Sequence, residues 1–119
     1  MFQGASATLS KLKADRVIVA KRLQLKPETI IAAGAVSVDT PLTFLTTAGA
    51  IALTLADGRD GDVKIIIMHY DGGTATLTPA HFRGGTTATL TFDDVYDSWM
   101  GVFFNGYWWT IGTPTATIA

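Results

Sequence analysis

Residues 99–112, WMGVFFNGYWWTIG, constrain the fold of this chain more than any other stretch. Asn105 and Gly106 separate two runs of aromatic and β-branched residues, which favour strands. An Asn-Gly pair tolerates the positive φ angles that both central positions of a type I′ turn require, and this turn matches the twist of paired strands. The sequence therefore predicts a β-hairpin with its turn at Asn105-Gly106.

All three tryptophans of the chain lie in this hairpin. Adjacent residues on a strand point to opposite faces, so Trp108 and Trp109 cannot both enter one core. One of them must face a second surface, which is solvent, another segment or another subunit. We therefore expect the hairpin to supply the aromatic residues of an oligomer or surface contact: Trp99, Phe103, Tyr107, Trp108 and Trp109.

Strand patterns and turn residues recur along the rest of the chain. Residues 35–55 alternate apolar and polar side chains, which is typical of strands with one buried face. Residues 63–70, VKIIIMHY, predict a central strand that is buried on both sides. The expected fold is all-β, a compact antiparallel β-sandwich or short barrel (jelly-roll-like) with an extended N-terminal arm. The sequence leaves open whether it is a jelly roll, another sandwich or a short barrel.

The composition favours association over membrane insertion. Charged residues make up 16% of the chain and hydrophobic residues 48%, against a typical charged fraction of about 25%. A small domain of this kind has more apolar surface than a monomer easily covers. We expect no membrane contact, because no apolar run reaches the roughly 18 residues of a spanning helix. The chain has no cysteine, which excludes disulfides and thiolate metal sites.

Charge is distributed unevenly along the chain. Residues 1–26 contain six basic residues and one acidic residue, a net charge of +5, whereas residues 27–119 contain three basic and nine acidic residues, a net charge of −6. Since complementary charge steers association, the basic segment is expected to dock on an acidic partner surface. A solvated basic strand is the alternative. We expect no direct nucleic-acid contact, because the aromatic residues lie in the acidic part of the chain.

These patterns divide the chain into two parts. Residues 1–33 are expected to form a basic arm with short strands, and residues 34–119 the β body. The basic side chains of the arm are the candidate docking residues: Lys11, Lys13, Arg16, Lys21, Arg22 and Lys26.

Few residues suit a metal ion. The turn DGRDGDV contains three aspartates but lacks the glutamate that completes an EF-hand loop. His69 and His81 are the only histidines, and a zinc site would need a further ligand such as Asp71. In a trimer, three copies of one histidine near the axis would form a three-His site. We expect these groups to be structural, with no metal ion and no cofactor.

Catalytic patterns are also missing. No serine lies in a G-x-S-x-G context, and the glycine pairs follow no phosphate-loop pattern. Asp93 and Asp94 would point apart on a strand, so they would not act as a catalytic carboxylate pair. We therefore expect no catalytic site.

Residues 34–112 resemble a module that is common in structural proteins of tailed bacteriophages. The resemblance covers about two thirds of the chain. The segments that carry it are, in order, LTLADG, DGGTATLTP, GGTTATLTF and WMGVFFNGYWWTIG. The preceding text ADRVIVAKRLQL resembles short strand repeats that lead into such modules in trimeric fibre proteins.

The resemblance implies a non-enzymatic virion protein. Similar modules occur in capsid decoration (cement) proteins and in tail or head fibres, and a 119-residue chain without a long shaft is more similar to a decoration protein. On this hypothesis, a homotrimer lies on the capsid surface. Residues 1–26 contact the major capsid protein, and binding stabilises the shell. The alternative is a fibre or receptor-binding β module that recognises a host surface glycan through exposed aromatic residues.

Overall fold

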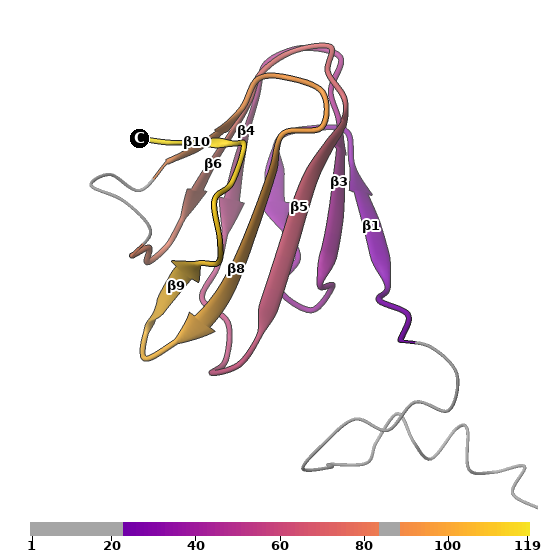
Figure 1. Cartoon of the computed structure of the whole chain (residues 1–119). Coiled ribbons are helices and arrows are strands. Elements are labelled where there is room, and N and C mark those ends of the chain that lie inside the picture. The colour runs from indigo at the N-terminus through magenta and orange to yellow at the C-terminus, as the bar shows by residue number, and fades with distance from the viewer. Residues whose placement is uncertain (1–22, 84–88) are drawn as a thin grey trace, which may run out of the picture.

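The computed structural model describes residues 23–83 and 89–119, which form a β-sandwich of two five-stranded sheets (Figure 1). Sheet A contains, in spatial order, β1 (Pro27–Ile30), β3 (Leu42–Thr46), β5 (Val63–Tyr70), β8 (Ser98–Phe104) and β9 (Tyr107–Thr110). Sheet B contains β10 (Thr117–Ile118), β7 (Leu90–Phe92), β6 (Ala75–Pro79), β4 (Ile51–Leu55) and β2 (Gly34–Val36). The expected all-β sandwich is confirmed.

Both sheets are mixed, which differs from the antiparallel pairing that the sequence predicted. Strands β1 to β6 alternate between the sheets, so that β1, β3 and β5 pair in parallel, as do β2, β4 and β6. Parallel neighbours need a crossover connection, and here each crossover contains a strand of the opposite sheet. The later strands then join in antiparallel orientation. Strand length and turn spacing are the same in both arrangements, so the sequence pattern does not separate them.

Strand β5 occupies the centre of sheet A, as the run VKIIIMHY predicted. Lys64, Ile66 and Met68 point into the sandwich and are fully buried. Ile65 and Ile67, on the opposite side of the strand, are half-buried. The second side of β5 is therefore only partly covered by the described residues.

The C-terminal hairpin is confirmed. Strands β8 and β9 pair in antiparallel orientation around Asn105 and Gly106, whose φ angles are 52° and 87°. Both angles are positive, as a type I′ turn requires. Trp108 is fully buried and Trp109 is 38% exposed, so the two tryptophans do point to opposite sides.

Aromatic side chains of the hairpin form one end of the core. The rings of Trp99 and Trp108 meet edge-on with centroids 6.3 Å apart, and Phe103 packs on Trp108 with centroids 5.3 Å apart. The indole N–H of Trp99 donates to Thr110 Oγ1 at 3.0 Å, which satisfies the one polar group of that ring. A Cβ at Gly101 would overlap the Trp99 ring, so this position on β8 requires glycine.

The described residues begin close to the body. Of the expected arm, residues 1–33, the structure describes residues 23–33, and Pro27–Ile30 within them pair with β3 as an edge strand of sheet A. Residues 1–22 lie outside the described part. Within the described ranges, no helix is long and apolar enough to cross a membrane.

Candidate functional site

The five aromatic residues predicted for an oligomer or surface contact divide into two groups. Trp99, Phe103 and Trp108 point inward from β8 and β9 and are at most 5% exposed. They belong to the core, which corrects the expectation that they contribute to a surface. The strand alternation that buries Trp108 leaves Tyr107 and Trp109 on the outer side.

Tyr107 and Trp109 differ in what covers them. The guanidinium of Arg83 lies 4.2 Å from the centroid of the Tyr107 ring, and His81 packs edge-on against the same ring. Tyr107 is therefore half-buried. Trp109 is 38% exposed, and its indole N–H donates to the carbonyl of Phe104 at 2.8 Å.

Of the six basic docking residues, the structure describes only Lys26, which is exposed immediately before β1. The other five lie outside the described residues: Lys11, Lys13, Arg16, Lys21 and Arg22.

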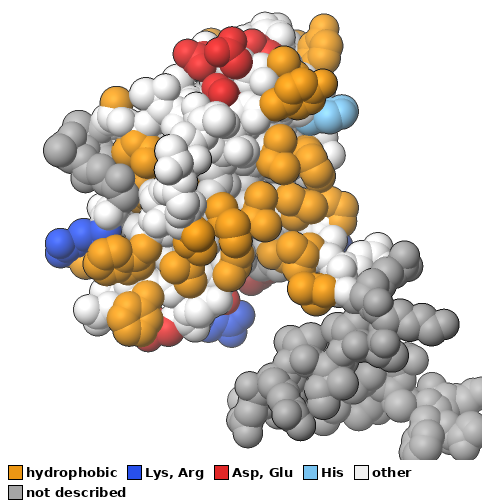
Figure 2. Space-filling view, viewed as in Figure 1, with side chains coloured by type: hydrophobic (Ala, Val, Ile, Leu, Met, Phe, Trp, Pro, Cys, Tyr) orange, Lys and Arg blue, Asp and Glu red, His pale blue; other side chains and the backbone are white. Residues whose placement is uncertain are grey.

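The outer side of sheet A carries a continuous group of solvent-facing apolar side chains. We call it the apolar face, and it consists of Leu42, Phe44, Val63, Ile65, Ile67, Met100, Val102, Phe104, Trp109 and Ile111. All of them are half-buried or exposed, and Figure 2 shows hydrophobic side chains gathered over these strands. Sequence reasoning missed this face because it predicted that β5 is buried on both sides, and because on β8 it chose Trp99 and Phe103, which point inward, for the surface contact. Apolar residues at both odd and even positions of these strands are the pattern that indicates it.

Strand register arranges the apolar face in rows. One row crosses the whole sheet and runs through Pro27, Leu42, Ile65, Met100 and, directly after β9, Ile111. A second row runs through Val63, Val102 and Trp109. The outward residues of these neighbouring strands are thus in contact distance of one another, and the apolar surface is continuous.

The apolar face is hollowed at two places. One hollow of about 490 Å³ lies at the hairpin end, where Val102, Phe104 and Trp109 meet Gly61. The other, of about 260 Å³, lies at the opposite end of β8 and includes Ile65 and other residues of the face. The face therefore has both projecting rings and depressions.

The apolar face is also uncharged. No Asp, Glu, Lys or Arg is among the outward residues of the strands of sheet A, all of which the structure describes. The charged residues of these strands, Glu28 and Lys64, point inward. The guanidinium of Arg83, on the ring of Tyr107, places a charge at the hairpin margin of the face. The face itself offers apolar contact.

Lys64 is buried on the inner side of β5. Its Nζ lies 3.4 Å from Glu28 Oε2 and donates to the carbonyls of Ser37 at 2.7 Å and Thr40 at 2.5 Å. Burial lowers the pKa of Lys64, and the Glu28 carboxylate opposes that effect without cancelling it. These contacts tie β1, β5 and the segment between β2 and β3 together, which indicates a structural role.

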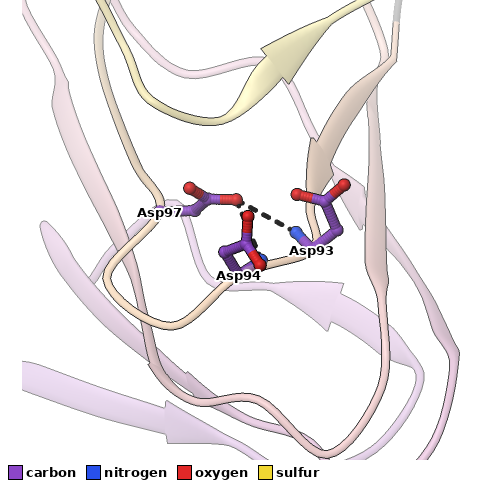
Figure 3. A group of neighbouring side chains, drawn as sticks. All are labelled: Asp93, Asp94 and Asp97. Atoms are coloured by element: carbon purple, nitrogen blue, oxygen red, sulfur yellow. Dashed lines mark hydrogen bonds between the residues drawn. The ribbon is translucent and has the colours of Figure 1, made fainter.

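Three aspartates lie together in the turn between β7 and β8 (Figure 3). Asp97 Oδ2 accepts the backbone N–H groups of Asp93 at 3.1 Å and Asp94 at 3.0 Å. A hydrogen bond between the carboxyl groups of Asp93 and Asp97 is the main cause that raises the pKa of Asp93, because it favours the protonated form. Asp93 and Asp94 are in a turn rather than on a strand, which corrects the expected geometry. The hydrogen bonds account for the cluster as a closed turn, and we assign no ligand to it.

The acidic turn between β4 and β5 is likewise held by its own hydrogen bonds. Asp62 Oδ2 accepts the backbone N–H of Arg59 at 2.8 Å, and Asp60 Oδ1 accepts that of Asn105 at 3.0 Å. The second bond ties this turn to the tip of the C-terminal hairpin. The segment DGRDGDV was compared above with a calcium-binding EF-hand loop. Two of its three aspartates accept hydrogen bonds from backbone N–H groups.

The two histidines lie in different surroundings. His81 Nδ1 is 2.9 Å from the Asp57 carboxylate. His69 lies on the outer side of sheet A and packs edge-on against Phe44, with centroids 6.1 Å apart. In the part of the chain that the structure describes, neither histidine belongs to a group of three metal-ligating side chains.

Comparison with known proteins adds no family to this description. No protein-family model matches the chain, and no curated protein matches it.

Proposed function

We propose that this chain is a non-enzymatic structural protein of a phage virion, a trimeric decoration protein that binds the outer capsid shell and stabilises it. The observation that carries the proposal is the apolar face of sheet A. Large, uncharged, solvent-facing side chains on a sandwich with a filled core suit a protein that works by adhesion. The module that residues 34–112 resemble supports the assignment to a virion.

In this proposal the contact with the capsid is made by the basic segment, residues 1–26. Residues 1–26 carry a net charge of +5 and the remainder −6, so the two parts of the chain favour different partners. The basic side chains dock on acidic patches of the major capsid protein, while the acidic body projects from the shell. Trimers at three-fold or quasi-three-fold points then bridge neighbouring capsid subunits and resist outward pressure.

Cosedimentation with capsids tests this proposal. The full-length chain is mixed with capsids of the phage whose genome encodes it, at low and at high salt. We expect binding that weakens as salt rises, because screening reduces attraction between exposed charges. A variant with Lys11, Lys13, Arg16, Lys21 and Arg22 changed to Gln loses binding, and a variant with Arg59 and Arg83 changed to Gln retains it. Binding by the first variant at the wild-type level would contradict the role of the arm.

A receptor-binding module is the second candidate, and one observation favours it: Trp109 is exposed beside Phe104. Sugar recognition combines stacking on an aromatic ring with polar groups that fix the hydroxyls. The hollow at Trp109 is lined by Gly61, Val102, Phe103 and Phe104, and none of these side chains is polar. A glycan array therefore separates the candidates. We expect no hits, and a hit that Trp109→Ala abolishes would favour the receptor-binding module.

A further inference from the structure

The exposed apolar side chains of the apolar face adjoin one another and form one continuous surface, in contrast to isolated exposed residues. An accessible aromatic side chain presents about 150–250 Å², so Phe104 at 57% exposure and Trp109 at 38% exposure together leave on the order of 200 Å² of apolar surface. Met100, Val63 and Ile111 are each more than a third exposed and adjoin these two residues. A stable interface covers about 800 Å² on each partner, and these exposed side chains supply a substantial part of the apolar area that such a contact needs.

Charge indicates which partner fits the apolar face. The whole chain carries a net charge of −1, but residues 27–119 carry −6, so the acidic turns of two bodies repel one another where they meet. The aspartate clusters lie in turns between strands, at the ends of the sandwich, and not on the outer side of sheet A. The apolar face is therefore the surface on which two like-charged copies approach at least electrostatic cost.

The projections and depressions of the apolar face are suited to contact between copies of the chain. A contact between identical subunits requires that projections and depressions occur on the same molecule. The rings of Phe104 and Trp109 project beside one hollow, and a second hollow lies near Ile65 and Met100 on the same face.

The edge of sheet A at β9 offers no competing route to association. Residues 81–83 lie along β9: Trp108 N–H donates to the carbonyl of His81 at 3.0 Å, and Arg83 N–H donates to the carbonyl of Trp108 at 2.9 Å. These hydrogen bonds use backbone groups on which an added strand would pair. Association at this side of the sheet therefore proceeds through the face.

We propose that the apolar face of sheet A is the surface through which copies of this chain pack on one another. This inference rests on the proposed function insofar as that function requires an oligomer, and it adds the surface that holds the oligomer together. It is independent of the capsid contact, which the proposed function assigns to residues 1–26.

Light scattering coupled to size-exclusion chromatography tests the inference on the full-length chain. The face variant carries Met100→Glu and Phe104→Glu, which place two charges on outward, exposed positions of β8. The control variant carries Ala52→Glu and Thr78→Glu, which add the same charge to exposed positions on the outer side of sheet B. We expect a wild-type mass that is a multiple of 12.6 kDa, the same mass for the control, and a single-chain mass for the face variant.

Each outcome separates this inference from the proposed function. A wild-type monomer, or a face variant that keeps the wild-type mass, overturns the inference. A wild-type dimer supports the inference and contradicts the trimer. A monomeric face variant that still cosediments with capsids supports the inference, and loss of capsid binding by arm variants that remain oligomeric supports the proposed function alone.

A second measurement guards against misfolding of the face variant. The chain has no cysteine, so a single Met100→Cys or Ala52→Cys substitution gives one labelling site. In the oligomer we expect a maleimide to label Ala52→Cys rapidly and Met100→Cys slowly. At a protein concentration low enough for light scattering to give the single-chain mass, we expect the two variants to be labelled at the same rate. Equal labelling of the two variants in the oligomer would overturn the inference.

Discussion

The outer sides of the two sheets have the same architecture and opposite chemistry. On sheet A one row of outward residues reads Pro27, Leu42, Ile65, Met100 and Ile111. On sheet B a corresponding row reads Ala52, Thr76, Thr91 and Thr117. Threonine is β-branched and supports a strand without adding a large apolar surface. Sheet B shows that this fold needs only such residues on an outer face, so the large side chains on sheet A serve something other than the fold of the subunit.

The inner sides show the reverse distribution. Sheet A buries Lys64 and Thr43 between its apolar core residues, with the half-buried Glu28 beside them. Sheet B contributes only apolar side chains to the buried core: Val36, Leu53, Leu55, Ala75, Leu77, Leu90 and Phe92, with Ala116 and Ile118 beside them. Sheet A therefore has charge inside and none on its outer face. Its outer face also carries the uncharged polar residues Thr29, Thr46 and Ser98 together with His69, but its large side chains are apolar, which suits a contact surface.

The neighbouring tryptophans of β9 give the largest expected effect, and they sharpen the contrast between inner and outer sides. Trp108→Ala removes a fully buried ring and the hydrogen bond from its indole N–H to the carbonyl of Ala56. We expect a loss of about 3–5 kcal/mol in the free energy of unfolding, since large core truncations leave cavities. Trp109→Ala is expected to cost the subunit about 1 kcal/mol, because the ring is partly exposed.

Urea unfolding followed by circular dichroism measures both variants at one fixed protein concentration, because oligomers unfold in a concentration-dependent manner. Light scattering on the same samples separates subunit stability from association. We expect Trp109→Ala to weaken association and Trp108→Ala to weaken the fold. Equal losses of stability in the two variants would remove the distinction between the sides of β9.

The buried ion pair gives the next largest effect and tests the charge inside sheet A. Glu28→Gln leaves the Lys64 ammonium without its counter-charge, although the carbonyls of Ser37 and Thr40 still accept from it. We expect a loss of about 2–3 kcal/mol, somewhat below the 3–5 kcal/mol typical when a buried pair is broken. Lys64→Met is expected to cost less, because Glu28 is partly exposed and remains hydrated. A double variant that loses as much as the sum of the single variants would show that the two side chains do not interact.

The pH dependence of the same variants follows from the lowered pKa of Lys64. Between its folded pKa and the value of 10.5 for the unfolded chain, the unfolded state binds more protons than the folded state. The contribution of Lys64 to stability therefore rises with pH across that window and falls as pH drops through the folded pKa. We expect the slope of stability against pH to be steeper in the wild type than in Lys64→Met as the pH rises toward 10.5. Parallel slopes would contradict the direction of the shift.

Local pattern was sufficient to predict some elements and not others. The turn at Asn105-Gly106, the central position of β5 and the opposite orientations of Trp108 and Trp109 depend on neighbours in the sequence, and the structure confirms all three. The parallel pairing of β1, β3 and β5 depends on which strands meet across the two sheets. Alternation and turn spacing carry no information on that choice.

The candidate site shows the same division. One of Trp108 and Trp109 was predicted to face a second surface, and the structure shows that it is Trp109. The apolar face as a whole was not predicted, because its rows form only when β3, β5, β8 and β9 are aligned in register. The Lys64–Glu28 pair joins residues that lie 36 positions apart, so a lysine within an apolar strand was the one local indication of it.

The smallest expected effect concerns the threonine face of sheet B, and it is the most direct way to break the comparison. Thr54→Val replaces an exposed β-branched residue by one of nearly equal shape and similar strand preference. We expect the free energy of unfolding to change by no more than about 0.5 kcal/mol, as is usual for surface substitutions, and the mass in solution to stay as in the wild type. Urea unfolding and light scattering measure the two quantities. A clear loss of association in Thr54→Val would mean that the outer side of sheet B is also a contact surface, and the chemical difference between the two faces would then no longer identify sheet A as the one that subunits share.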